Sequence, residues 1–442
     1  VLLSELPGLV RSYWGVFGWF SVTAPNWFYA LLGGMALAAL GGLVVGGCRA
    51  GWRGKWGDKH QLSGLAVIAV WIAGVGVGLV RWSSLIPSFQ GRLLFPAAAA
   101  IALFLALGLG SWIGGRWREV PALVAGAVMA VVAAWVPFGV IRPAYAPPRL
   151  LTTAEQAAVP QRLDLLVGEG MELLGYRLDD GEVRPGQDLS VTLYWRARAR
   201  MDQNYSVFVH LLAETELIVG QRDTYPGRGL FPTTLWEPGD AIADTYVVPV
   251  SPTAFSPTRA QVEVGLYRVE TGERQVVLDR DGRVLGDNVR FGEILVRSEP
   301  RDGIANPLDY RFGEGMALIG YDLDRTALRA GETLHLTLYW KCLAPMAKDY
   351  TVFTHVLGPG DAIWAQKDAW PQDGAAPTST WQVGRVVADR YDLVVRPETP
   401  GGVYDVEVGV YLAETLERLS VLGPGGSVEG RRVLLNPVRV VP

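Results

Sequence analysis

The chain has 442 residues, of which 50% are hydrophobic, and its 40 basic and 44 acidic side chains give a formal net charge of −4. Because the charge is near neutral and no extended Lys/Arg cluster follows the apolar part, nucleic-acid binding has no support. The two cysteines, Cys48 and Cys342, fall in the apolar third and in the distal polar part. This placement predicts neither an internal disulfide nor a metal cluster.

The first residues precede any membrane-length run. The chain begins with Val1 and lacks the layout of a signal peptide, so we expect further sequence upstream. The aromatic stretch Ser12–Phe20 is too short to span a bilayer. Aromatic segments of this kind suit the headgroup region, and residues 1–26 are therefore predicted to be an interfacial segment outside the cytoplasm.

Four long uncharged runs rich in Leu, Ala, Val and Gly dominate residues 27–142. Their length and lack of charge predict a bundle of about four transmembrane helices. The predicted spans are about 27–45, 62–80, 93–110 and 120–140. Buried helices of a soluble domain are the alternative, which four uncharged runs in such close succession disfavour.

The loops between these runs predict an orientation. Basic residues lie in the first and third loops, at Arg49, Arg53, Lys55, Lys59, Arg116 and Arg118. By the positive-inside rule both loops are cytoplasmic, and everything after Arg142 is outside. The middle loop, from Arg81 to Arg92, carries two arginines itself, so the charge bias is moderate.

Several residues of this region resemble a known bacterial family. They are the aromatic stretch Trp14–Trp19, Pro25, the run Gln90-Gly91-Arg92, and Pro96. This pattern resembles the C-terminal membrane region of polytopic proteins of the DUF2142 type, akin to the GT-C glycosyltransferases that use polyprenyl-phosphate sugars. The resemblance covers roughly residues 10–141. It implies a bacterial plasma-membrane protein of cell-envelope glycan assembly, with additional helices upstream.

The resemblance also implies a place for a lipid-linked sugar. Arg92, together with Arg81, would hold its phosphate on the outer side, since a guanidinium group matches phosphate oxygens. The alternative is an interfacial arginine that snorkels from a helix end. GT-C enzymes carry a catalytic carboxylate in an early outer loop, whereas Glu5 is the only acidic residue expected outside before the polar part. No catalytic residue and no cofactor is therefore predicted, and this chain alone is not expected to be a complete enzyme.

The polar part is a tandem repeat. Residues 168–195 align without gaps with residues 313–340, at an offset of 145, and share 16 identities over 28 positions. The similarity continues as far as residues 262–274 and 406–418, at an offset of 144, and predicts a duplicated domain. A proline-rich linker, 143–165, precedes the first copy, 166–298; a second linker, 299–311, precedes the second copy, 312–442.

Each copy is predicted to be all-β. In Leu189–Trp195, apolar residues alternate with Ser190, Thr192 and Tyr194, which is typical of a strand with one buried face. Turn-forming Pro-Gly and Asp-Gly steps separate several such runs. The pattern predicts two immunoglobulin-like or jelly-roll sandwiches after the helical bundle.

Two pairs of repeated polar residues are candidates for chemistry. His210 and His355 occupy equivalent positions, as do Asp223 and Asp368. A His/Asp pair on adjacent strands can bind a metal or act in acid–base catalysis, but no further ligand is near in sequence. We therefore favour a partly buried histidine held by a carboxylate as part of the fold, and predict no metal.

Aromatic residues before a proline are candidates for sugar stacking. Tyr225 and Trp370 fall in equivalent loops, and polar neighbours are available for hydrogen bonds in both copies: Asp223, Arg222, Asp368 and Lys367. The alternative is that each ring folds back onto its own sandwich.

Two hypotheses follow. In the first, the helices form part of a lipid-linked sugar site and the sandwiches bind an envelope glycan or a partner; the strands also resemble β-sandwiches appended to bacterial membrane glycosyltransferase-like proteins. In the second, the chain is a non-enzymatic surface protein whose sandwiches are spacer or adhesion modules. The partners expected are the lipid bilayer and, under the first hypothesis, a polyprenyl-phosphate-linked sugar.

Overall fold

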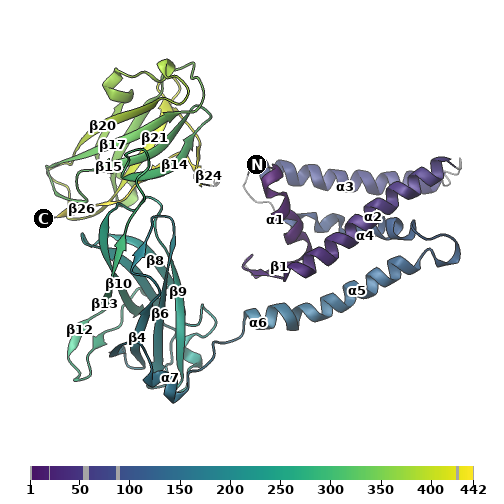
Figure 1. Ribbon diagram of the computed structural model, residues 1–442, viewed down its shortest axis with the longest axis horizontal. Coiled ribbons are helices and arrows are strands. Elements are labelled where there is room, and N and C mark those ends of the chain that lie inside the picture. Colours follow the sequence, from purple (N-terminus) through teal and green to yellow (C-terminus); the bar gives the residue numbers. More distant parts are fainter. Residues whose placement is uncertain (1, 19, 53–58, 86–89, 425–427, 442) are drawn as a thin grey trace. The chain divides into compact units, whose positions relative to one another are not determined.

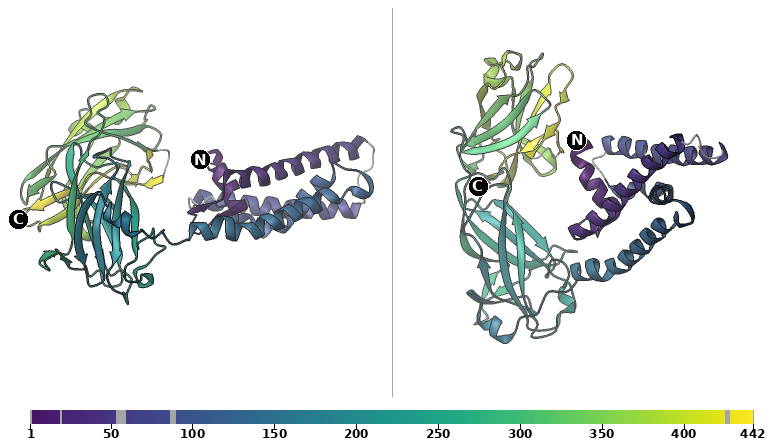
Figure 2. Two further views of the ribbon diagram at one scale, coloured as in Figure 1. Left: turned by 60° about the horizontal axis from the view of Figure 1, so that its bottom comes forward. Right: turned by 45° about the vertical axis from the view of Figure 1, so that its right-hand side comes forward.

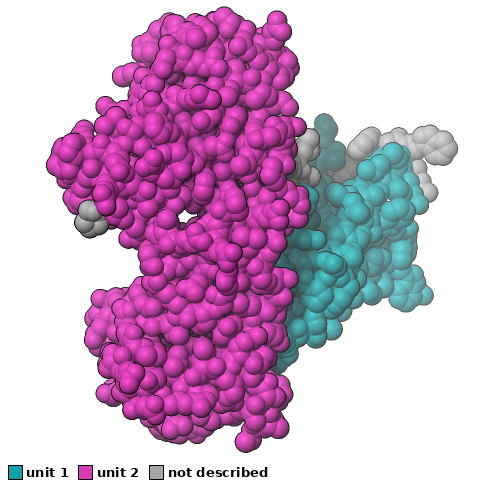
Figure 3. All heavy atoms as spheres, turned by 60° about the vertical axis from the view of Figure 1, so that its left-hand side comes forward, with its two compact units in different colours: residues 1–146 teal, residues 147–442 magenta. Residues whose placement is uncertain are grey.

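The computed structural model describes residues 2–18, 20–52, 59–85, 90–424 and 428–441 (Figure 1). Trp19, Arg53 and Lys55 lie outside the described residues, as does part of the loop between Arg81 and Arg92. The chain divides into two compact units, residues 1–146 and 147–442, which Figure 3 draws in different colours.

The first unit is helical. Its elements are α1 (Leu2–Gly15), β1 (Val16–Phe17), β2 (Val22–Thr23), α2 (Asn26–Trp52), α3 (Lys59–Leu85), η1 (Gly91–Ala97), α4 (Ala98–Gly110), η2 (Gly115–Trp117), α5 (Val120–Val136), η3 (Pro137–Ile141) and α6 (Arg142–Ala144). Four stretches of helix are long and apolar enough to cross a membrane: Asn26–Ala50, Leu62–Ser83, Gly91–Gly110 and Gly115–Ala144.

Small residues bring α2 and α4 into close contact. A Cβ atom added to Gly42 would lie 1.9 Å from the carbonyl oxygen of Gly108, so only glycine allows this approach. At the same end of α4, the indole of Trp112 donates to the carbonyl of Ala38 at 2.8 Å. Direct backbone approach, as is usual between membrane helices, therefore holds this pair together.

The interfacial stretch predicted before the first span is a helix followed by a two-stranded turn. α1 packs on η1, where a Cβ on Gly91 would lie 2.2 Å from the backbone nitrogen of Tyr13. The Gly91 amide also donates to Ser12 Oγ at 2.8 Å. The glycine of the Gln90-Gly91-Arg92 run therefore provides a packing contact with α1.

The second unit contains two β-sandwiches, and Figure 2 shows the strands of each in facing layers. The first sandwich follows the short helix α7 (Thr153–Ala157) and consists of β3 (Gln161–Val167), β4 (Met171–Leu178), β5 (Glu182–Val183), β6 (Asp188–Ala197), β7 (Ser206–Ala213), β8 (Ile218–Thr224), η4 (Thr233–Leu235), β9 (Ala241–Pro249), β10 (Thr258–Tyr267), β11 (Val277–Leu278), β12 (Val284–Gly286) and β13 (Val289–Val296). Its sheets have the orders β5-β13-β10-β7-β8 and β12-β11-β3-β4-β6-β9.

The second sandwich repeats this plan. It consists of β14 (Asn306–Phe312), β15 (Met316–Leu323), β16 (Ala327–Arg329), β17 (Thr333–Cys342), β18 (Thr351–Gly358), η5 (Pro359–Asp361), β19 (Ala362–Ala369), η6 (Pro371–Gly374), η7 (Thr378–Thr380), β20 (Val386–Val394), β21 (Gly402–Leu412), β22 (Glu417–Arg418), β23 (Val421–Leu422), β24 (Val428–Gly430), β25 (Val433–Leu434) and β26 (Val438–Val441). Its sheets have the orders β20-β17-β15-β14-β23-β24 and β16-β26-β21-β18-β19, with β22 and β25 on β21. The predicted fold class, apolar helices followed by β-sandwiches, is confirmed.

Alternating side chains build a separate core in each sandwich. On β6, Leu189, Val191, Leu193 and Trp195 are all buried, and Trp195 is fully enclosed. Trp340 has the same place in the second core. The period-two pattern of the sequence thus corresponds to the inner face of each sheet.

The sandwiches begin earlier in the chain than expected. The first strand of each copy, Gln161–Val167 and Asn306–Phe312, starts inside the segments expected to be linkers, 143–165 and 299–311. Both strands pair with the following strand through a shifted register, which interrupts the simple alternation that marks a strand in sequence.

Buried hydrogen bonds join the two sandwiches. The carbonyl of Thr253 accepts from the hydroxyl of Tyr321 at 2.6 Å, and the Ser256 amide donates to Asn306 Oδ1 at 2.8 Å. The Phe255 amide donates to Asn436 Oδ1 at 2.9 Å, while its ring packs against the second core. Since these polar groups are buried and paired in one geometry, the junction is directional.

Candidate functional site

The repeated histidines lie on the outer face of one sheet in each sandwich. On β7, Val207 and Val209 enter the core, so Phe208 and His210 face outward between them. The Phe208 ring lies over Gly265 on β10, where a Cβ atom would come within 2.4 Å of it. Phe353 covers Gly409 in the same way, with an approach of 2.1 Å. The glycine in both copies is therefore explained by an aromatic ring that covers it.

A cation covers each of these rings. The guanidinium carbon of Arg274 lies 4.4 Å from the centre of Phe208, and that of Arg418 lies 4.3 Å from the centre of Phe353. The histidine ring also contacts each phenyl ring, at 5.0 Å between ring centres in both copies. The aromatic face is thus already occupied by the protein's own side chains.

Carboxylates hold the first histidine. His210 Nε2 lies 3.1 Å from Asp223 Oδ1, and Nδ1 lies 3.7 Å from the buried Glu263. Burial of the imidazole opposes its protonation, but the two carboxylates outweigh burial and raise the pKa of His210 to about 9. The contact with His210 is the main cause of the lowered pKa of Glu263. Arg290 completes the group, 3.2 Å from Glu263.

The second histidine is held more tightly. His355 Nδ1 lies 2.9 Å from Glu407, and Nε2 lies 3.3 Å from Asp368. Burial opposes ionisation of Glu407, yet His355 and Arg432 hold its pKa below its usual value. Tyr411 donates its hydroxyl proton to the second oxygen of Asp368 at 3.2 Å.

These contacts favour the structural interpretation of the His/Asp pairs. Each buried carboxylate contacts a histidine and is paired with at least one arginine, so these groups serve one another within the sheet. Within the described ranges, no group of three or more His, Cys, Asp or Glu side chains is arranged to hold a metal ion.

The predicted aromatic loops have the same backbone in both copies. After β8, residues Gly227, Arg228 and Gly229 have positive φ angles, as do Gln372, Asp373 and Gly374 after β19. A buried carboxylate fastens each turn: Asp244 accepts from the Gly227 amide at 2.8 Å, and Asp389 accepts from the Gln372 amide at 2.7 Å.

These anchoring carboxylates belong to the fold. Burial raises the pKa of both Asp244 and Asp389 above the usual value of a carboxyl group. The hydroxyl of the buried Tyr391 donates to Asp389 at 2.5 Å. The repeated Asp and Tyr positions of the sequence thus serve the loop, a role that their repetition alone did not reveal.

The two loop aromatics differ in exposure. Tyr225 is half-buried, whereas 42% of the Trp370 surface is exposed. Of the two, Trp370 therefore presents a ring to solvent, while Tyr225 comes closer to the alternative of a ring folded onto its own sandwich.

Strand geometry separates the predicted polar partners of these rings. Phe208 pairs with Asp223 and Val209 pairs with Arg222, so Asp223 and Arg222 point to opposite faces of the sheet. Lys367 and Asp368 are separated in the same way. Lys367 lies 2.7 Å from Asp373 and over the ring of Tyr391, away from the histidine cluster. Neighbouring residues of a strand alternate between faces, so the two polar residues of each copy lie on different surfaces. Their role as sugar-binding partners stays a prediction.

The arginines predicted to bind lipid phosphate lie at one end of the helical unit. The guanidinium carbon of Arg92 lies 5.3 Å from the centre of Phe20. Arg81 is exposed near the end of α3. The described contacts place an aromatic ring, and no acidic side chain, against Arg92.

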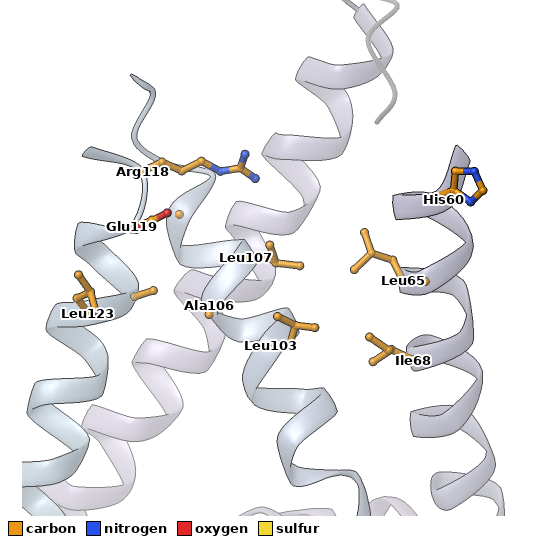
Figure 4. Close-up of a pocket in the computed structure, with 12 residues that line it drawn as sticks. His60, Leu65, Ile68, Leu103, Ala106, Leu107, Arg118, Glu119 and Leu123 are labelled. Carbon is orange, nitrogen blue, oxygen red and sulfur yellow. The ribbon is translucent and has the colours of Figure 1, made fainter. Parts of the chain in front are cut away.

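A groove lies at the opposite end of this unit, between α3, α4 and α5 (Figure 4). Its volume is about 840 Å³. Apolar side chains form its walls, and the polar residues that line it are His60, Arg118 and Glu119. The sequence analysis did not identify this groove, since helix packing decides which faces meet.

No protein-family model matches the sequence, and no curated protein sequence matches it. A solved structure with a partial likeness is the collagen adhesin from S. aureus, at 6% identity. The match covers 61% of this chain and 93% of that chain, with a TM-score of 0.19. The β-sandwich architecture of this chain is established by its own strand pairing.

Proposed function

We propose that this chain is a membrane-anchored surface protein whose tandem sandwiches form a fixed module outside a bacterial plasma membrane. The helices anchor the module, and the sandwiches act as a spacer or an adhesion surface. The observation that carries the proposal is the union of four membrane-length apolar helices with two sandwiches joined through a buried, directional junction.

The junction favours a mechanical role. Tyr321 and Asn306 bind backbone groups of the preceding sandwich, and Arg439 donates to the carbonyl oxygens of Thr215 and Glu216 at 2.7 and 2.6 Å. A flexible linker would let the domains reorient, whereas this junction fixes their spacing. The occupied ring faces and neutralised carboxylates of both sandwiches also suit a structural module.

The orientation is part of the proposal and has a direct test. Single cysteines at Lys59 and Glu299, in a background with both Cys48→Ser and Cys342→Ser, would be treated with a membrane-impermeant maleimide in intact cells. Lys59→Cys is expected to react only after permeabilisation, and Glu299→Cys in intact cells. The reverse pattern would overturn the proposed orientation.

The surface role is tested with residues 147–442, which hold both sandwich cores. This unit would be screened on a glycan array, with circular dichroism as the check of folding. If the sandwiches act as a spacer, no glycan binds specifically. Binding that disappears in Trp370→Ala would favour the second candidate.

The second candidate is a role in cell-envelope glycan assembly, with a polyprenyl-phosphate-linked sugar near Arg92 and Arg81. The observation in its favour is the exposed ring of Trp370, which offers a flat apolar face to a sugar. The likeness of residues 10–141 to GT-C-type membrane proteins supports the same idea. Deletion of the gene for the intact protein would then alter envelope glycans, and unchanged glycans would count against it.

A further inference from the structure

The groove between α3, α4 and α5 has an apolar part and a polar mouth. Leu65 and Ile68 of α3 face Leu103 and Leu107 of α4 across it, as Figure 4 shows. Gly64 widens the groove, because no atom lies within 4 Å of the position that its Cβ would take. The volume of about 840 Å³ lies within the range of roughly 300–1,000 Å³ that is usual for small-molecule sites.

The walls restrict the chemistry of an occupant. Below the mouth, the lining residues are leucine, isoleucine, alanine and glycine. These walls offer no side-chain hydrogen-bond donor or acceptor, so a hydrocarbon chain fits them and a polar metabolite does not.

The mouth carries a cation directed over the groove. In Figure 4 the guanidinium of Arg118 points across the opening, with His60 on the facing helix. The backbone of Arg118 is held against α4, where its carbonyl oxygen lies 2.8 Å from the Cβ position of Gly110. Arg118 forms no salt bridge with an acidic side chain of the described residues and lies in the lining of the groove.

Glu119, the acidic residue at the mouth, forms no ion pair with Arg118 in the part of the chain that the structure describes. It is the N-cap residue of α5 and lines the same opening. The Arg118 guanidinium therefore stays available for an anion, and its planar fork binds two oxygens of a phosphate.

We propose that this groove binds an anionic diacyl phospholipid, with the acyl chains along α3, α4 and α5 and the phosphate at Arg118. The inference rests on the proposed membrane insertion of the helices. It places a lipid site at the end of the unit opposite Arg92 and Arg81. The apolar walls of the groove match the acyl chains of a phospholipid. Arg118, which lies where the helices end, matches its phosphate.

The test uses the full chain, purified in detergent from membranes and analysed by native mass spectrometry. Phosphatidylglycerol and phosphatidylcholine with identical acyl chains would be added in separate titrations. The wild type is expected to retain phosphatidylglycerol about tenfold better, because the choline ammonium of phosphatidylcholine offsets the charge of its phosphate, whereas phosphatidylglycerol presents Arg118 with an uncompensated negative charge. Arg118→Ala is expected to abolish this preference.

Two pairs of variants distinguish recognition of the lipid headgroup from binding of the acyl chains in the groove. Arg116→Ala removes a neighbouring cation that stacks on Trp117 and does not line the groove, so the preference should persist. Gly64→Leu fills the groove and should lower retention of both lipids severalfold. Gly74→Leu is its control, since Gly74 also has open space at Cβ but lies outside the lining.

Each alternative outcome is informative. Equal retention of the two lipids, or an unchanged preference in Arg118→Ala, overturns the inference. A dimer that carries no lipid and is disrupted by Gly64→Leu would identify a second copy of the chain as the occupant instead. If the chain is absent from the membrane fraction, the proposed function fails as well; if it is present but shows no lipid preference, only the groove proposal fails.

Discussion

The two sandwiches have the same strand arrangement but differ in the hydrogen bonds of their histidines and in the exposure of their loop aromatics. In the second, His355 lies within hydrogen-bonding distance of both carboxylates, at 2.9 and 3.3 Å. In the first, Nδ1 of His210 is 3.7 Å from Glu263 and has no hydrogen-bond partner among the described residues. The loop aromatic is exposed in the second copy and half-buried in the first. Features kept in both copies serve the fold, and features that differ are where the copies can have separate roles.

The largest effect should come from the matched core tryptophans. Trp340→Ala is expected to lower the free energy of unfolding by about 4 kcal/mol, because it leaves a cavity in a fully enclosed core. Calorimetry of residues 147–442 would measure it, with Trp195→Ala as the counterpart. If the junction couples the sandwiches, both variants shift one common transition; two independent transitions would contradict a rigid pair.

The histidine clusters should contribute different amounts to the free energy of unfolding in the two copies. His355→Ala is expected to cost about 3 kcal/mol, since it removes the hydrogen bonds of the imidazole to two carboxylates, Glu407 and Asp368. His210→Ala should cost less, because its contact with Glu263 is longer. Urea denaturation of both variants measures the difference, and equal losses would show that the extra hydrogen bond of the second copy has no energetic weight.

The first cluster also predicts a pH dependence. The folded pKa of His210, about 9, lies above the unfolded value of about 6.5. Its protonated form therefore contributes stability that is complete below about pH 6.5 and is lost as the pH rises through about 9. After screening at the partly exposed Asp223, about 2 kcal/mol of stability should disappear over this window.

A matched variant identifies the source of this loss. In His210→Gln the free energy of unfolding should change less between pH 6.5 and 9 than in the wild type. Denaturation midpoints at several pH values provide the measurement. A wild-type profile that the variant reproduces would mean that other groups titrate in this range.

The junction predicts a smaller effect. Asn306→Ala leaves the buried amide of Ser256 without its acceptor and should cost about 1.5 kcal/mol. It should also weaken the coupling between the two sandwiches in calorimetry. Asn288→Ala is the control, because that side chain donates only to the neighbouring Asp287. Similar losses in both variants would argue against a stabilising junction.

The sequence predicts those parts of this molecule that have a local signature. Membrane-length helices follow from uncharged runs, and the inner faces of strands such as Leu189–Trp195 follow from alternation. The duplication is visible because the offset between the copies is nearly constant. Contacts between distant strands have no such signature: His355 and Glu407 are 52 residues apart and meet only through the register of β18 and β21. The groove beside Arg118 was missed for the same reason.

The loop aromatics show what repetition can and cannot predict. Equivalent positions correctly indicated equivalent loops, but only the strand pairing shows that Asp223 and Arg222 lie on opposite faces of the sheet. The alternation rule was available, yet it depends on knowing that β8 continues through both residues.

The smallest expected effect concerns these loops and bears most directly on function. Trp370→Ala should change the free energy of unfolding by less than about 0.5 kcal/mol, since much of the ring is already exposed. Tyr225→Ala, which removes a half-buried ring, should cost roughly 1 kcal/mol. Thermal denaturation of the two variants decides the order. A Trp370 variant as destabilised as the Tyr225 variant would mean that both rings serve their own sandwiches. A negligible cost would mean that the fold does not require this exposed tryptophan, and a binding role would then be the better explanation for its place on the surface.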